Sequence, residues 1–294
     1  LKIKLAPSPE QHARLLATME RFNSACDFIA VVAFENSLAS KFKLQKLVYS
    51  EVKQQFSLSA QLVVRAIAKV VEAYKRDTSI RCTFRSHGAV VYDERIMSFE
   101  GLEAVSLWTV EGRETMPMVL GDYQRARLHW AKGQADLCLM GREFYLLATI
   151  DTPEEPPIEP SGFLGVDLGI VRLAVDSEGN QATGDGVEAV RRRTLKLRRR
   201  LQAHGGKNAK RRLVRLRGKE ARFRRNENHR IAKQLVGRAK DTGRGIGLED
   251  IKGIRDRTTV RRADRARHSG WAFWQLLAFI VYKARLAGVP VEIV

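Results

Sequence analysis

Two short apolar segments, each with a carboxylate placed in it, constrain this chain most. Residues 163–170 read FLGVDLGI and residues 245–251 read GIGLEDI. Glycine-bounded apolar runs of this length are typical of buried strands. The stretch between them has helical periodicity, and strands alternating with helices indicate an α/β sheet. The pattern therefore predicts an α/β unit whose neighbouring strands each offer one acid.

Asp167 and Glu249 are the candidate site residues. A carboxylate inside an apolar run would lose hydration, so it should become neutral, find a partner or bind a metal. A single Asp of this kind would be interpreted as a turn residue or the partner of an arginine. Two such acids on neighbouring strands can hold Mg²⁺ or Mn²⁺, and a pair of these ions about 4 Å apart can activate water against a phosphodiester. Asp250 should point to the opposite face of its strand and is the weaker candidate.

Residues 191–230 form a polycation with 18 lysines and arginines against two glutamates. They lie within a stretch, about 187–239, whose periodicity predicts two helices with a break at residues 204–208. A charge run is usually a solvated face, but this one is too one-sided for internal ion pairing, and the whole chain has a net charge of +19. Nucleic-acid phosphates are the favoured partner. The predicted contacts are Arg191, Arg192, Arg193, Lys196, Arg198, Arg199, Arg200, Lys207, Lys210, Arg211, Arg212, Arg215, Arg222, Arg224 and Arg225.

The first half of the chain has a different pattern. Alternation over residues 2–5 predicts a strand, and Ser8 followed by Pro9 predicts the start of the first of three helices, which end near residue 76. Short β-prone runs separated by turns then follow, which indicates an antiparallel barrel or sandwich. Residues 151–160 contain four prolines and are interpreted as a stiff linker.

Several further residues carry expectations of their own. Asp176 is expected to be a turn residue of a hairpin. The last helix should run from Trp271 to about residue 287 after a cap at Ser269, with Trp271 and Trp274 packed in the core, and residues 252–267 should form a loop.

The remaining expectations concern cysteines and compartment. The three cysteines at positions 26, 82 and 138 lie far apart without a CxxC pair, so they give no zinc site and are expected to be reduced. The sequence has neither an apolar run long enough to cross a membrane nor a signal-peptide core. This favours a cytoplasmic protein without a membrane partner.

The C-terminal motifs resemble the TnpB family of transposon-encoded RNA-guided nucleases, which is related to compact type V CRISPR effectors. The resemblance rests on GVDLGIVRLA at 165–174, the basic helical hairpin, IGLEDI at 246–251, SGW at 269–271 and YKA at 282–284. It covers residues 160–294 by motif and the N-terminal half by layout.

The resemblance implies an α+β multidomain fold. Residues 1–7 and 78–155 would form a wedge-like β-barrel, residues 8–77 a helical recognition insert, and residues 156–294 an RNase H-like (RuvC-like) α/β domain with the basic hairpin inserted. Asp167 would be the first catalytic acid and Glu249 the second, with Mg²⁺ or Mn²⁺ as cofactor.

The partners implied by the resemblance are a guide RNA and target double-stranded DNA. The family also carries a zinc ribbon and a third catalytic Asp after the strand that ends at Val294, and neither occurs in these 294 residues, so Zn²⁺ is expected only with such a ribbon. Three functions follow from the sequence in order of preference: a metal-dependent RNA-guided DNA endonuclease, an RNA-guided binder that does not cut, and a general RNA-binding protein.

Overall fold

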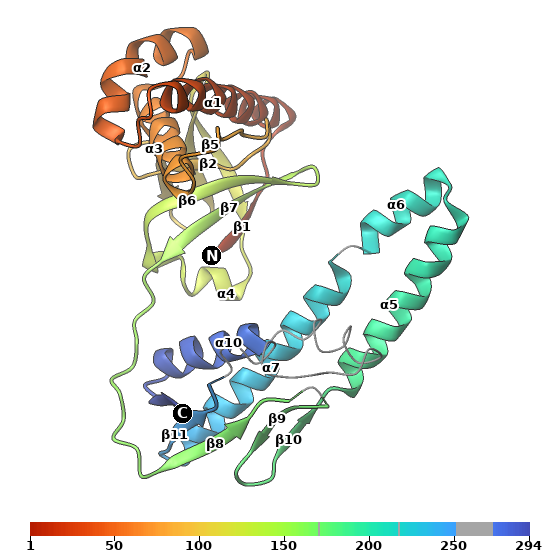
Figure 1. The fold of residues 1–294 in the computed structure, drawn as a ribbon. Coiled ribbons are helices and arrows are strands. Elements are labelled where there is room, and N and C mark those ends of the chain that lie inside the picture. Colours follow the sequence, from red (N-terminus) through yellow and green to blue (C-terminus); the bar gives the residue numbers. More distant parts are fainter. Residues whose placement is uncertain (170, 217, 251–272) are drawn as a thin grey trace. The chain divides into compact units, whose positions relative to one another are not determined.

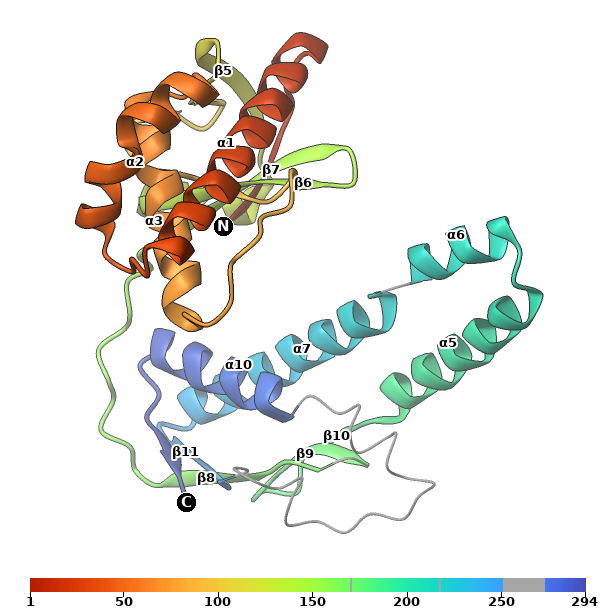
Figure 2. The ribbon, with the colours of Figure 1, turned by 45° about the horizontal axis from the view of Figure 1, so that its top comes forward.

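A computed structural model describes residues 1–169, 171–216, 218–250 and 273–294 (Figures 1 and 2). The chain divides into two compact units, Leu1–Thr152 and Pro153–Val294. Expectations for the loop at 252–267, for Ser269 and for Trp271 lie outside the described residues. The described part of the chain contains no helix that is both long enough and apolar enough to span a membrane.

Seven antiparallel strands form the sheet of the first unit, in the order β2-β6-β7-β1-β5-β4-β3. This single, nearly closed sheet agrees with the barrel expectation rather than with a sandwich. The β1 strand lies between β7 and β5, so the first residues of the chain sit at the centre of the sheet. The bounds are β1 (Lys2–Leu5), β2 (Val90–Tyr92), β3 (Met97–Glu100), β4 (Ala104–Thr109), β5 (Gly112–Val119), β6 (Ala131–Met140) and β7 (Glu143–Ile150).

Three helices follow β1 and share one core with the sheet: α1 (Pro9–Glu35), α2 (Lys41–Phe56) and α3 (Ala60–Arg76). The start of α1 is fixed by a capping box, in which the Ser8 hydroxyl accepts from the Gln11 N–H at 3.2 Å and the Gln11 side chain accepts from the Ser8 N–H at 3.0 Å. The buried residues of α3 recur three or four positions apart, so they form one apolar stripe that faces the core. Between β5 and β6 lie the short α4 (Asp122–Arg125) and a 3₁₀ turn, Leu128–Trp130.

A mixed five-stranded sheet forms the second unit, in the order β10-β9-β8-β11-β12. The β11 strand is parallel to both β8 and β12, whereas β9 is antiparallel to β8 and to β10. The bounds are β8 (Phe163–Asp167), β9 (Arg172–Asp176), β10 (Gln181–Thr183), β11 (Gly245–Leu248) and β12 (Val291–Ile293).

The helices between β10 and β11 are α5 (Asp185–His204), α6 (Lys207–Leu216) and α7 (Lys219–Asp241). Two helices with one break were predicted, and the structure has three. The predicted break lies at Gly205, which has a φ of +60°, and a second occurs at Gly218, which has a φ of +79°. A left-handed backbone ends a helix, and glycine adopts it without the steric cost of a Cβ. The α5 and α6 helices extend away from the sheet, and α7 returns to it (Figures 1 and 2).

The core of the second unit lies between the sheet and the helices α7 and α10 (Phe273–Leu286). Phe273, Leu276 and Ile280 of α10 are buried in it, whereas Trp274 is 49% exposed. The core position predicted for Trp274 is therefore wrong, because the buried stripe of α10 begins one residue earlier, at Phe273.

The proline-rich segment before β8 is bonded to the second unit. The N–H groups of Glu155 and Ile158 donate to the carbonyls of Leu286 and Gly288 at 3.2 and 2.9 Å. The Glu154 carboxylate accepts from Arg285 at 2.7 Å. Residues from Pro153 onward thus belong to the second unit and are not a free spacer.

Candidate functional site

The register of β8 against β11 brings the two predicted acids together. The last paired residues are Val166 and Leu248, and the next residues along these parallel strands are Asp167 and Glu249. Side chains that are in register on neighbouring strands point to the same face, so both carboxylates leave the sheet at the same level and on the same side.

This side is the solvent face of the sheet. Leu164 and Val166 are buried in the core, while Gly165 and Asp167 alternate with them and are exposed. Glu249 is exposed as well. The expectation that Asp167 would be dehydrated is therefore wrong, because the apolar residues beside it point to the other face.

Asp167 and Glu249 line one open hollow of about 420 Å³. Backbone bonds hold the residues around Glu249 in place: the Val294 N–H donates to the Leu248 carbonyl at 2.9 Å, and the Asp250 N–H donates to the Val294 carbonyl at 2.7 Å. The other lining residues are Gly165, Val166, Val175, Asp176, Ser177, Gly247, Leu248 and Val294.

The chemistry of this donor set fits a hard divalent cation. Mg²⁺ takes oxygen ligands, and proteins usually bind it through one or two carboxylates while water and phosphate oxygens complete its coordination. Asp167 and Glu249 supply two carboxylates to one hollow. Among the described residues, His, Cys, Asp and Glu do not form a cluster of three or more that could enclose a metal by themselves. The pair thus suits an ion shared with a phosphorylated ligand.

Asp176 does more than occupy the hairpin turn, which is the role predicted for it. Its side chain is fully buried and accepts from the N–H groups of Glu178 and Asn180 at 3.1 and 2.9 Å and from Arg238 on α7 at 2.8 Å. Burial alone would raise the pKa of Asp176, but the hydrogen bonds from Asn180, Arg238 and Glu178 outweigh it and hold the pKa below its usual range. Asp176 therefore ties the β9–β10 turn, one wall of the hollow, to α7.

The predicted phosphate contacts are distributed over α5, α6 and α7, and most are exposed. Glu188 accepts from Arg191 at 2.7 and 2.8 Å and from Arg192 at 2.8 Å, and chiefly the Arg191 bonds lower its pKa to about 2. Arg191 and Arg224 are half-buried. A second hollow, of about 630 Å³, is lined by Asn208, Arg211, Arg212, Arg215, Leu216 and Lys219.

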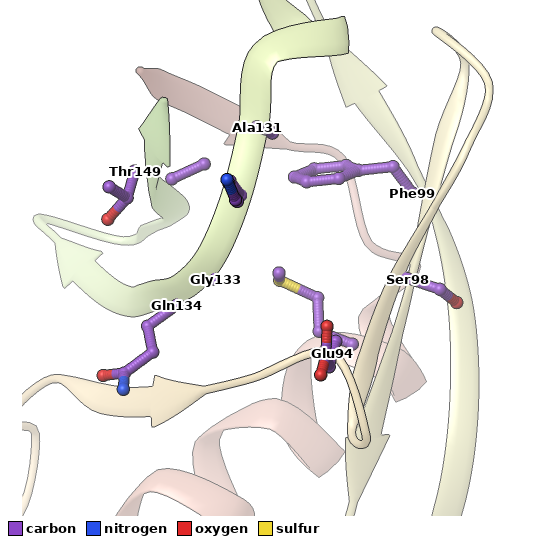
Figure 3. Close-up of a pocket in the computed structure, with 10 residues that line it drawn as sticks. Glu94, Ser98, Phe99, Ala131, Gly133, Gln134 and Thr149 are labelled. Carbon is purple, nitrogen blue, oxygen red and sulfur yellow. The ribbon is translucent and has the colours of Figure 1, made fainter. Parts of the chain in front are cut away.

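A third hollow, of about 340 Å³, lies in the first unit, and sequence reasoning missed it. The Phe99 ring points from β3 toward Ala131 and Gly133 of β6, and Glu94 lies at one end (Figure 3). The opening coincides with a register shift of β6 between Ala131 and Ala135, where Gly133 has a φ of +77°. Gly133 within a β-prone run is the signal that could have indicated the bulge.

Comparison with known proteins gives a consistent set of relatives. Residues 146–252, which include both acids, match the family model OrfB_IS605, described as a probable transposase. A curated relative, the CRISPR-associated endodeoxyribonuclease Cas12f1 of Syntrophomonas palmitatica, is 27% identical over 168 residues. That match covers 51% of this chain and 33% of the relative, so the chain spans about a third of the length of the curated protein.

Solved structures agree at the level of the fold. The Cas12f1–sgRNA–target DNA complex matches with a TM-score of 0.59 and 12% identity, over 95% of this chain and 72% of that one. A CRISPR-Cas12f ternary complex has a TM-score of 0.41 and 12% identity, over 96% of this chain and 71% of that one. The family model and the curated relative thus support a likeness to TnpB-like, Cas12f-related proteins, and the solved complex has a similar fold.

Proposed function

We propose that this chain is the guide-binding and cutting part of an RNA-guided DNA endonuclease. It would hydrolyse phosphodiesters in DNA that matches the guide and lies beside a short flanking motif. The observation that carries the proposal is the parallel register of β8 and β11, which sets the carboxylates of Asp167 and Glu249 side by side in one open hollow. The family match over 146–252 supports it, because this range includes both strands.

The second unit has the strand order expected of an RNase H-type sheet. Two successive hairpins give β8, β9 and β10, and β11 and β12 then join on the other side of β8, parallel to it. This order supports the proposal that the second unit, 153–294, is a RuvC-like domain with the basic hairpin inserted between β10 and β11. Within the first unit, residues 1–7 and 78–152 would be the wedge-like barrel and residues 8–77 the recognition insert.

In the proposed reaction the two carboxylates bind the metal, and neighbouring residues hold these carboxylates in place. Asp167 and Glu249 would hold Mg²⁺ or Mn²⁺, which when bound supplies charge for activating water and for stabilising the leaving oxygen. The chain itself fixes the spacing of the acids through the β8–β11 pairing and anchors the backbone after Glu249 through Val294. Asp176 and Arg238 fix the wall beside Asp167. Preorganisation of this kind avoids a cost of orientation during the reaction.

Guide RNA and target DNA are the proposed partners. The second unit has 32 lysines and arginines against 16 acidic residues, so it carries most of the net charge of the chain. The exposed arginines of α5, α6 and α7 suit phosphates, whose contacts position a nucleic acid without reading its sequence. The solved structure with the similar fold is a complex with sgRNA and target DNA.

The test is cleavage of guide-matched DNA by the full-length protein with its guide RNA and Mg²⁺. Asp167→Ala and Glu249→Ala should each cut at least about 100-fold more slowly while binding the target with unchanged affinity. Asp241→Ala is the matched control, because Asp241 is an exposed acid at the end of α7. Unchanged cutting by Asp167→Ala would refute the site. Target binding without cutting by the wild type would favour the RNA-guided binder.

A further inference from the structure

Two glycines lie side by side beneath the two acids. Gly165 and Gly247 are register partners across β8 and β11, two residues before Asp167 and Glu249 on the same face. Both line the hollow, and Gly165 is exposed while Gly247 is half-exposed. At this level β8 and β11 therefore carry no side chains beside the carboxylates, while Val175 and Ser177 lie opposite Asp167 and Gly165 in the same hollow.

The backbone does not require glycine at either position. Neither residue has the positive φ that favours glycine. A Cβ built on Gly165 would lie 3.8 Å from the Cβ of Ser177, and one built on Gly247 would lie 4.0 Å from the Cα of Gly165. These are ordinary van der Waals distances, so alanine fits at both positions.

Two neighbouring glycines, in contrast, leave no room for a Cβ. A Cβ on Gly245 would lie 2.5 Å from the Phe163 ring, and one on Gly169 would lie 2.7 Å from the Arg172 carbonyl oxygen. Packing therefore requires glycine at these two sites but not at Gly165 and Gly247. Glycine inside a strand weakens the sheet, and it often marks a place where a ligand approaches the backbone closely.

We propose that Gly165 and Gly247 form a floor on which the sugar–phosphate backbone of one nucleic-acid strand lies during cutting. This inference rests on the proposed function and extends it to substrate positioning. The two glycines offer no donor or acceptor side chain that could distinguish bases, so their contact is to the sugar–phosphate backbone and independent of sequence. A methyl group on the floor would lift the strand away from Asp167 and Glu249, and a displacement of about 1 Å can lower a rate by about 100-fold.

The experiment compares Gly165→Ala, Gly247→Ala and the double variant with wild type, as full-length protein with guide RNA. The control is Gly237→Ala on α7, where a Cβ would meet nothing within 4 Å. We expect the melting temperature of both floor variants to equal or exceed that of wild type, because alanine loses less conformational entropy on folding. We expect their cleavage to fall by about 10- to 100-fold, with guide and target affinity unchanged.

A second measurement does not depend on cutting. With Ca²⁺ in place of Mg²⁺, hydroxyl-radical footprinting of the bound DNA strands should show wild-type protection at the nucleotides to be cut. The larger Gly165→Val should lose that protection and keep the rest of the footprint. If the floor variants cut and protect the DNA as the wild type does, the proposed role of Gly165 and Gly247 is refuted. Wild-type cutting by Asp167→Ala would instead overturn the proposed function, so the two failures are distinguishable.

Discussion

Replacing Asp176 by alanine should destabilise the second unit strongly. The carboxylate is fully buried and accepts hydrogen bonds from two backbone N–H groups, from Asn180 and from Arg238. Removing it leaves those donors without their acceptor, and each hydrogen bond to a charged group contributes about 1.5 to 3 kcal/mol. Arg238 is 41% exposed and can turn to water, so we discount its share. The free energy of unfolding should fall by about 2 to 4 kcal/mol.

The lowered pKa of Asp176 also predicts how its contribution to stability changes with pH. Because the pKa of Asp176 is lower in the folded protein, its ionised form stabilises the fold above the unfolded pKa of about 3.9. That contribution is lost as the pH falls through the folded pKa. The stability difference between wild type and Asp176→Asn should therefore be constant near neutral pH and shrink in acid below about pH 4.

Urea unfolding at several pH values measures this difference, and hydrogen exchange at the amides of residues 178 and 180 locates it. Glu178→Ala is the matched control in the same turn, because Glu178 is 45% exposed in its ion pair with Arg244. Its loss should change stability by less than about 1 kcal/mol. Equal destabilisation by both variants, or an Asp176→Ala protein as stable as wild type, would refute the reasoning.

Three further predictions concern other parts of the chain. Replacing Arg198, Arg199 and Arg200 together by alanine should reduce the slope of log affinity against log salt for double-stranded DNA by about 2 to 3, and an unchanged slope in a salt titration would count against these contacts. Burial raises the pKa of Cys26 to about 12, so iodoacetamide at pH 8 should modify the half-buried Cys82 first, as peptide mass spectrometry would report. Asn23 is fully buried and donates to the carbonyls of residues 19, 86 and 88. Asn23→Ala should therefore lower the melting temperature, and urea unfolding should show a loss of about 2 to 4 kcal/mol in the free energy of unfolding.

Local sequence signals predicted much of the first unit. Ser8 and Gln11 form their capping box within four residues, and the apolar spacing of α3 depends only on the helical period. Such features need no knowledge of distant contacts. The evenly spaced strands predicted a barrel or a sandwich without deciding between them, and the bulge at Gly133, which depends on how β6 meets β7, was not predicted.

The sequence predicted that Asp167 and Glu249 lie on neighbouring strands, which the β8–β11 pairing confirms, but it did not predict the surroundings of Asp167. One face of β8 is apolar and buried, while the other carries Phe163, Gly165 and Asp167 and is exposed. Composition alone does not distinguish this from a strand buried on both faces. The role of Asp176 depends on Arg238, 62 positions later in the chain. Trp274 was misassigned because a helix rich in apolar residues gives a weak indication of which stripe faces the core.

The pairing of β8 with β11 joins segments that are separated by the whole basic hairpin. Bringing these strands together requires closure of a long loop, which makes the contact costly in chain entropy and slow to form. During synthesis α5, α6 and α7 leave the ribosome before Gly245 does, so a positively charged hairpin exists before the two carboxylates can meet. The basic helices are therefore complete before the pair of acids, which forms only when both ends of the hairpin have been brought together. Under the proposed function, binding of a polyanion would precede the capacity to cut it.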